Sequence, residues 1–204
     1  MVVEQLKRKE LVIPLVIGIL FSILYNELPF KYFGAAFIGI VGVVLILYDI
    51  KIGLMAGVFI LPFMPDMLNL LYMYFLLAVF IFHEVIKDAN PLTKTKVDMP
   101  IVLFSIIIII STITSISPVD SLRDLALHIG GLCFLFVMIN SVNKRQDFNI
   151  IVTVLVFSAT LVALYGLYQF VVGVEVDKAW LDVKNNPGIT TRVYSVFNNP
   201  NILA

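Results

Sequence analysis

The sequence is poor in charged residues and in cysteine. Charged residues make up only 14% of its 204 residues, and 14 Lys and Arg balance 14 Asp and Glu, so the formal net charge is zero. A chain without a basic field gives no reason to expect nucleic acid as a partner. Its single cysteine, Cys133, lies within an apolar run. One cysteine can form no internal disulfide and makes no zinc site, so a structural metal is not expected.

Apolar residues are what the sequence holds in excess. They account for 60% of the chain, and the mean hydropathy of +1.01 lies outside the range of soluble domains. The charged residues form short clusters that separate apolar runs, as they must in a chain that crosses a bilayer repeatedly. The composition therefore predicts an all-α, polytopic membrane protein.

Seven apolar runs are candidate transmembrane spans: 11–25, 33–48, 52–64, 67–82, 99–116, 125–140 and 149–173. The first follows a basic stretch at 7–9 but shows no cleavage pattern at its end, so we predict an uncleaved span rather than a signal peptide. The run 52–64 is shorter than the about 17 residues of a perpendicular span, and it can instead form a re-entrant hairpin with its neighbour. Within it, Gly53 and Gly57 form a ridge that permits close helix packing. We therefore expect six or seven crossings.

The distribution of Lys and Arg orients these spans. With seven spans, nine Lys and Arg fall on the side of the amino terminus and five on the other, whereas Asp and Glu divide seven and seven. Because Lys and Arg concentrate in cytoplasmic loops, we predict a multi-pass protein of the cytoplasmic membrane with its amino terminus inside. An outer loop is expected at 174–198, and 1–204 as a whole is expected to form one transmembrane domain.

The start of the sixth run carries polar residues. Ser117 can cap a helix, and Pro118 suits its first turn. Arg123 stands next to Asp124, and Asp124 shares a helix face with His128. Two interpretations of Arg123 are open: an ion pair at a helix end, or an outward-facing site in which it holds a phosphate. His128 is either a neutral histidine bonded to a neighbouring helix or a group that handles protons.

Further polar signals lie near the end of the chain. Gln169 lies in the last apolar run, where its amide needs a partner. Asn199 before Pro200 has the form of a helix cap with a first-turn proline and predicts an eighth helix. Its start would present unpaired N–H groups and the positive end of the helix dipole to an anion such as phosphate. Arg192, a few residues earlier, has a guanidinium suited to phosphate oxygens.

The last residues form the most specific pattern in the sequence. It consists of Arg192, Tyr194, Ser195, Phe197, Asn199, Pro200, Asn201, Leu203 and Ala204, preceded by Tyr165, Gly166, Leu167, Tyr168 and Gln169 at a span end. This pattern resembles the signature of the O-antigen ligase and polymerase superfamily. The resemblance covers roughly the second half of the chain, 100–204, and the terminal pattern is its specific part. The Ser117-Pro118 segment also matches in position and character, but weakly.

The resemblance implies a bacterial membrane glycosyltransferase of about a dozen spans that builds cell-envelope polysaccharide. Such an enzyme takes a glycan from a polyprenyl carrier such as undecaprenyl pyrophosphate, on the outer face of the membrane. It joins the glycan to a hydroxyl of a lipid, glycan or protein acceptor and needs no metal and no cofactor. The choice between ligase and polymerase stays open.

The resemblance also implies roles for individual residues. Arg192 is expected to hold the pyrophosphate with help from Arg123, and Asn199, Asn201 and Gln169 complete the predicted substrate-binding set. The catalytic histidine of the family lies in a large outer loop further downstream, and nothing in this sequence matches it. We therefore expect no catalytic residue here, and we expect the chain to be the amino-terminal portion of a longer enzyme.

Two other interpretations stay open. In the first, the chain is a transporter or flippase, and Arg123, His128 and Gln169 line a pathway through it. Transporters place their binding groups near the midplane and show related halves, whereas the polar residues here gather near the outer interface and no repeat is evident. In the second, the chain is an assembly subunit without chemistry of its own.

Overall fold

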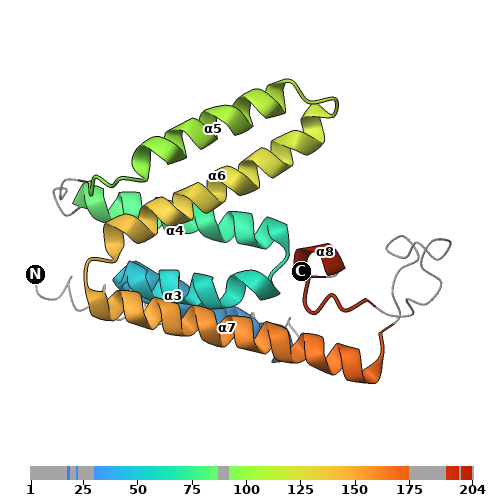
Figure 1. Ribbon diagram of the computed structural model, residues 1–204. Coiled ribbons are helices and arrows are strands. Elements are labelled where there is room, and N and C mark those ends of the chain that lie inside the picture. The colour runs from blue at the N-terminus through green and yellow to red at the C-terminus, as the bar shows by residue number, and fades with distance from the viewer. Residues whose placement is uncertain are drawn as a thin grey trace, which may run out of the picture. The chain divides into compact units, whose positions relative to one another are not determined.

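A computed structural model describes Gly18, Ser22 and residues 30–86, 92–174, 192–197 and 199–203. Every regular element in these ranges is a helix (Figure 1), which confirms the all-α prediction. The chain divides into two compact units, Met1–Tyr48 and Asp49–Ala204. Nearly all of the predicted span 11–25 and most of the predicted outer loop 174–198 lie outside the described residues, and the single-domain organisation stays a prediction.

The described helices fall on the predicted apolar runs. The first unit contributes α2 (Phe30–Tyr48). The second contains α3 (Ile50–Ile60), the short 3-10 helix η1 (Leu61–Phe63), α4 (Asp66–Ile86), α5 (Asp98–Ile113), α6 (Pro118–Ser141), α7 (Arg145–Val172) and α8 (Pro200–Leu203). The run 52–64 thus consists of a short helix that tightens into a 3-10 turn before α4 begins.

Local signals place several helix ends. The carboxylate of Asp49 accepts a hydrogen bond from the Lys51 N–H at 3.0 Å and caps α3. Gly173, with φ of 78°, ends α7 in a conformation that favours glycine. Ser117 occupies the cap position of α6 as predicted, but its side chain makes no capping hydrogen bond. The hydroxyl of Ser115 instead accepts the Ser117 N–H at 3.2 Å, so the capping role predicted for the Ser117 side chain is wrong.

The core of the second unit forms around α3. This helix packs against α4, α6 and α7, while α6 also packs against α4 and α5 (Figure 1). A methyl group added at Gly57 would lie 2.8 Å from the Phe134 ring and 2.9 Å from the Tyr72 ring. The Tyr72 hydroxyl donates to the Gly53 carbonyl at 2.6 Å. The predicted small-residue ridge therefore does allow neighbouring helices to approach α3 closely.

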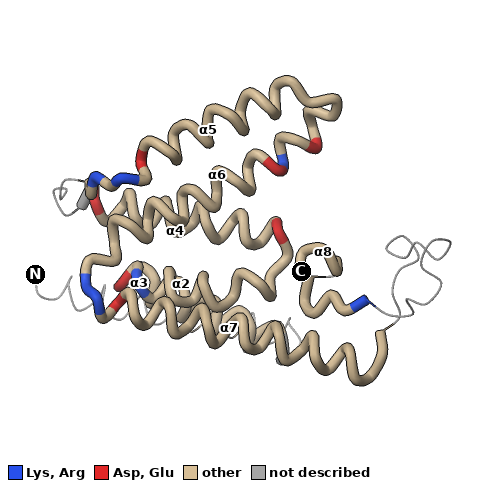
Figure 2. The backbone as a smooth tube through the Cα atoms, viewed as in Figure 1, with Lys and Arg blue, Asp and Glu red and all other residues tan. Residues whose placement is uncertain are grey.

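Three described helices are long and apolar enough to cross a membrane: Asp66–Glu84, Pro118–Ser141 and Arg145–Val172. Three apolar helices are shorter, namely Tyr32–Tyr48, Ile50–Phe63 and Asp98–Ile113. In the second unit, charged residues gather at the helix ends, and uncharged residues occupy the middle of each helix (Figure 2). Many large apolar side chains point outward along these middles, among them Ile107, Phe157 and Leu164. Such a surface suits lipid and not water, so the fold is that of a membrane protein.

Candidate functional site

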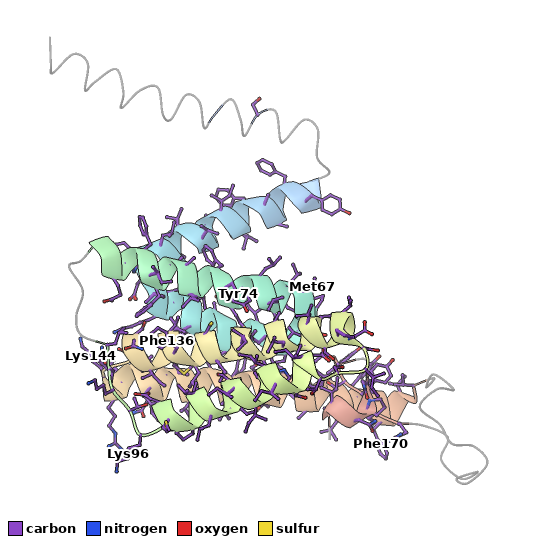
Figure 3. All side chains as sticks on the ribbon, turned by 90° about the horizontal axis from the view of Figure 1, so that it is seen from above. Met67, Tyr74, Lys96, Phe136, Lys144 and Phe170 are labelled. Carbon is purple, nitrogen blue, oxygen red and sulfur yellow. The ribbon has the colours of Figure 1, made fainter. Side chains whose placement is uncertain are left out.

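The charged residues that the structure describes in the second unit lie at two opposite ends of its helices (Figure 2). The end that we call the Lys144 end holds the starts of α3, α5 and α7. The end that we call the Asp66 end holds the start of α4, the α5–α6 turn, the end of α7 and residues 192–203. Figure 3 shows Lys96 and Lys144 at the first end and Phe170 at the second. The polar contacts and pockets of the two ends are therefore described in turn.

At the Lys144 end, the polar contacts are structural. Lys51 Nζ lies 2.5 Å from an oxygen of Asp147 and joins α3 to α7. Before α5, the Thr95 hydroxyl and N–H both donate to the Asp98 carboxylate, at 2.5 and 2.9 Å. These hydrogen bonds hold the pKa of Asp98 below its usual value. Each of these contacts joins two helices or begins one.

At the Asp66 end, Gln169 anchors the carboxyl-terminal segment, which consists of the described residues 192–197 and 199–203, to α7. Its side-chain oxygen accepts the N–H groups of Ser195 at 2.7 Å and Tyr194 at 3.3 Å. Its side-chain nitrogen donates to the Ser195 carbonyl at 3.1 Å. Gln169 is only 4% exposed, so these bonds form away from solvent. The amide that needed a partner in the apolar run finds it in the backbone of residues 194 and 195.

Ser195 has the backbone geometry that makes this contact possible. Its φ is 51°, in the left-handed region that non-glycine residues rarely adopt. The residue is 2% exposed, and its hydroxyl donates to the Val162 carbonyl at 2.6 Å. A methyl group added at Gly166 would lie 3.4 Å from Val193, so the segment also lies directly on the surface of α7.

The eighth helix begins where the sequence predicted. Asn199 accepts the Asn201 N–H through its side chain at 2.9 Å, and its carbonyl accepts the Ile202 N–H at 3.1 Å. The cap is therefore confirmed. The expectation of unpaired N–H groups is wrong for Asn201 and Ile202, because the cap itself occupies both of them, and Pro200 has no N–H. The start of α8 is thus less open to an anion than predicted.

Arg192 lies beside the cap. Its guanidinium donates to the side-chain oxygen of Asn201 at 3.2 Å, so Asn201 orients the arginine while its own N–H is bonded to Asn199. Arg192 is half-buried. The predicted residues Arg192, Asn199 and Asn201 are therefore brought together, and the two amides support the arginine and the helix start.

Arg123 forms an ion pair with a residue that the sequence did not indicate. One guanidinium nitrogen lies 3.3 Å from the carboxylate of Asp66 at the start of α4, and the two side chains are 56% and 64% exposed. The predicted ion pair at a helix end is present, but the partner comes from another helix. An exposed pair with a single contact of this length contributes little to stability, about 0–1 kcal/mol.

A pocket of about 510 Å³ brings Arg123 and the carboxyl-terminal segment together. It lies between the α3–α4 turn, α6 and residues 196–202, and its lining includes Leu61, Phe63, Asp66, Arg123, Phe197 and Ile202. Arg123 is thus the predicted site residue that lines this pocket. Arg192 and its neighbours belong to the segment that forms one wall.

The α3–α4 turn is the part of the site that sequence reasoning missed. Besides Asp66 it includes Asn69, whose side-chain nitrogen donates to the carbonyls of Leu61 at 3.0 Å and Met64 at 3.2 Å. The side-chain oxygen of Asn69 is buried and has no hydrogen-bond partner among the described residues. Pro62 and Pro65 mark a turn in the sequence, but no local signal indicates that this turn would meet Arg123.

The fold is that of an α-helical membrane protein, and one end of its helices holds a mostly apolar pocket that is also lined by Asp66, Asn69 and Arg123. Comparisons with protein-family models, with curated proteins and with solved structures found no match.

Proposed function

We propose that this chain forms the donor site of a membrane glycosyltransferase of the O-antigen ligase kind. In this proposal, the Asp66 end binds a polyprenyl pyrophosphate that carries a glycan, and the glycan passes to an acceptor hydroxyl. The observation that carries the proposal is the pocket of about 510 Å³ in which Arg123 meets the segment that follows Arg192. Two arginines then serve one end of the helices, where an anionic head group at the membrane surface can reach them.

The guanidinium of Arg123 can exchange its carboxylate partner, Asp66, for a pyrophosphate. Its contact with Asp66 is long and solvent-exposed, 3.3 Å with both side chains more than half exposed. A pyrophosphate carries more charge than one carboxylate and can accept paired hydrogen bonds from a guanidinium. We therefore expect pyrophosphate to displace Asp66 from Arg123 at little cost in stability.

Glycosyl transfer from a pyrophosphate requires positively charged groups near the leaving group. When the acceptor oxygen attacks the anomeric carbon, the bond from that carbon to the pyrophosphate oxygen breaks, and negative charge grows on the departing pyrophosphate. Arg192 and Arg123 would stabilise that charge in the transition state. A group that removes the acceptor proton is also required, and the proposal assigns this task to none of the described residues.

The three predicted amides have a positioning role in this proposal. Gln169 holds the backbone of residues 194 and 195, Asn199 caps α8, and Asn201 orients Arg192. A substrate that reached these amides directly would have to break bonds that hold the site together. We therefore assign substrate contact to the arginines and support of the arginines to the amides.

The proposal includes the seven-span topology and its orientation. The Asp66 end faces outward and the Lys144 end faces the cytoplasm, as the distribution of Lys and Arg favours. The stretch Ile50–Phe63 would rise only about 21 Å at 1.5 Å per residue, short of a hydrocarbon core of about 30 Å. This segment therefore crosses only where its neighbours or a thinner bilayer compensate for its length.

The test is a pair of substitutions in the full-length protein, assayed with its polyprenyl-linked donor. Arg192→Lys keeps the charge but loses the paired hydrogen-bonding geometry, and we expect it to lower glycan transfer by about 10²- to 10³-fold. Arg123→Lys should lower transfer as well, because the same geometry is lost there.

A matched control is Arg145→Lys, the same change at an exposed position at the Lys144 end, which should transfer glycan at the parental rate. Membrane insertion and expression are measured for every variant. If Arg192→Lys and Arg192→Ala both insert normally and transfer glycan at the parental rate, Arg192 is an ordinary interface arginine and the proposal is wrong.

A further inference from the structure

A second pocket at the Asp66 end, of about 460 Å³, lies between α5 and the first turns of α6. Its lining is rich in hydroxyl groups and includes Ser111, Thr112, Thr114, Ser121, Asp124 and His128. The volume lies in the range of small-molecule sites, roughly 300–1,000 Å³. The lining also includes two ionisable side chains, Asp124 and His128, which lie one turn apart near the start of α6 and are both exposed.

Hydrogen bonds within the protein decide which groups this pocket offers. The hydroxyls of Thr112 and Thr114 donate to backbone carbonyls one turn earlier, at 2.8 and 3.0 Å, and retain lone pairs that can accept. His128 Nδ1 lies 2.7 Å from the Asp124 carbonyl oxygen. A carbonyl oxygen can only accept, so Nδ1 carries the proton and Nε2 of the neutral ring is an acceptor.

The carboxylate of Asp124 adds the strongest acceptor. Among the described residues this carboxylate forms no hydrogen bond and no ion pair. The contact between Asp124 and His128 involves the Asp124 backbone carbonyl instead. The pocket thus offers acceptors together with one negative charge, and its lining contains no Lys or Arg. A phosphate would be repelled here, and the fitting ligand is one that brings several hydrogen-bond donors.

A metal ion and a polyol are two kinds of ligand that can satisfy such acceptors. Ca²⁺ takes about six to eight oxygen ligands, and Mg²⁺ demands near-ideal octahedral geometry. In the described part of the chain no group of three or more His, Cys, Asp and Glu side chains could hold a metal ion. A neutral polyol brings several O–H donors, each able to bond to a carboxylate, an imidazole nitrogen or a hydroxyl.

We infer that the pocket between α5 and α6 binds a neutral sugar ring, with Asp124 and His128 Nε2 accepting hydrogen bonds from its hydroxyls. Asp124 directly follows Arg123, and consecutive helical residues project about 100° apart. Arg123 accordingly lines the pocket at the α3–α4 turn, while Asp124 lines the pocket against α5. Helix α6 therefore separates an anion-binding side from a sugar-binding side. The choice of a sugar among polyols rests on the proposed function, which brings a glycan to this end.

The test measures binding of free glucose and N-acetylglucosamine to the full-length protein in nanodiscs of phosphatidylcholine, where no sugar detergent competes. Saturation-transfer NMR should show transfer to the ring protons of at least one of these sugars. Asp124→Asn removes the charged acceptor, and Thr112→Val removes a hydroxyl at nearly constant shape. We expect Asp124→Asn to weaken binding by about tenfold and Thr112→Val by less.

The matched control is Asp120→Asn, the same change one turn earlier on α6 at an exposed position that does not line the pocket, and it should bind like the parental protein. The inference is overturned if neither sugar gives transfer at concentrations on the order of 10 mM. It is also overturned if Asp120→Asn weakens binding as much as Asp124→Asn. A third contrary outcome is that Asp124→Asn leaves sugar binding unchanged and alters only the binding of Na⁺, measured by the ²³Na NMR line width.

The probes contain no phosphate, so this result is separable from the proposed function. Arg192→Lys should leave sugar binding unchanged even where glycan transfer fails. If Arg192→Lys inserts normally and transfers glycan at the parental rate while sugar binding still depends on Asp124, the donor-site proposal fails and the sugar pocket stands.

Discussion

At the scale of single residues, Gln169 shows how one buried amide can organise a segment far along the chain. Its two side-chain atoms pair with three backbone groups, the N–H of Tyr194 and the N–H and carbonyl of Ser195. Each buried polar group left without a partner costs about 1–3 kcal/mol. The amide also holds Ser195 in its left-handed conformation, which costs a further about 1–3 kcal/mol.

Replacing Gln169 therefore tests the attachment of the whole segment. We expect Gln169→Leu, which keeps the approximate size of the side chain, to lower the stability of the segment by about 2–4 kcal/mol. Limited proteolysis near residues 192–197 should become faster, and the thermal midpoint of the solubilised protein should fall. Gln146→Leu makes the same change at an exposed position in the first turn of α7 and should alter neither measurement. Equal proteolysis of both variants would contradict the role of Gln169.

At the scale of elements, α3 is short but central. It contacts α4, α6 and α7, and Leu54 on this helix is fully buried. Gly57 allows the rings of Tyr72 on α4 and Phe134 on α6 to lie against the α3 backbone. Close packing of small residues against larger ones is a main source of helix association in membranes, where lipid offers apolar contacts of its own.

A substitution at Gly57 should separate these helices. Gly57→Ala would place a methyl group 2.8 Å from Phe134 and 2.9 Å from Tyr72, and both rings would have to shift. Overpacking of this kind typically costs about 1–3 kcal/mol. Gly131→Ala is the matched control, because a methyl group there meets nothing within 4 Å. Thermal unfolding in detergent should show a loss for Gly57→Ala only, and a loss of equal size in both variants would indicate a general effect of glycine replacement.

At the scale of the whole molecule, the separation of charge and apolar surface is the dominant feature. The described charged residues of the second unit lie at the helix ends (Figure 2). The ends differ, since the Lys144 end holds an ion pair that joins α3 to α7, whereas the Asp66 end holds two pockets and two arginines. The proposed function places ligand binding at the Asp66 end, which is suited to chemistry at one surface of a membrane.

Orientation is tested by reporter fusions. We predict that a fusion after Lys144 reports the cytoplasm and that a fusion after Lys184, a residue outside the described ranges, reports the outside. The reason is that α7 has 28 residues with uncharged residues along its middle and is long enough to cross the bilayer. Both fusions on the same side would overturn the seven-span topology and with it the assignment of the Asp66 end to the outer face.

The sequence by itself determined the class of the protein and most of its helix positions. Apolar runs, prolines and caps are local signals, so they predicted an all-α membrane protein, the start of α6 at Pro118 and the start of α8 at Pro200. They also indicated the arginines and amides that now lie at the Asp66 end, but not the polar residues of the α3–α4 turn. The seven-span count and the family resemblance stay predictions.

Only the tertiary structure decided which of these residues meet. Arg123 pairs with Asp66, 57 residues away, and Gln169 pairs with Ser195, 26 residues away. Local patterns show which residues share one helix face, but the neighbour of that face depends on packing between helices, as at Gly57. For the same physical reason the sequence could not show that Gln169, which is buried, bonds to the backbone of residues 194 and 195, or that Asn201, which is exposed, bonds to Arg192.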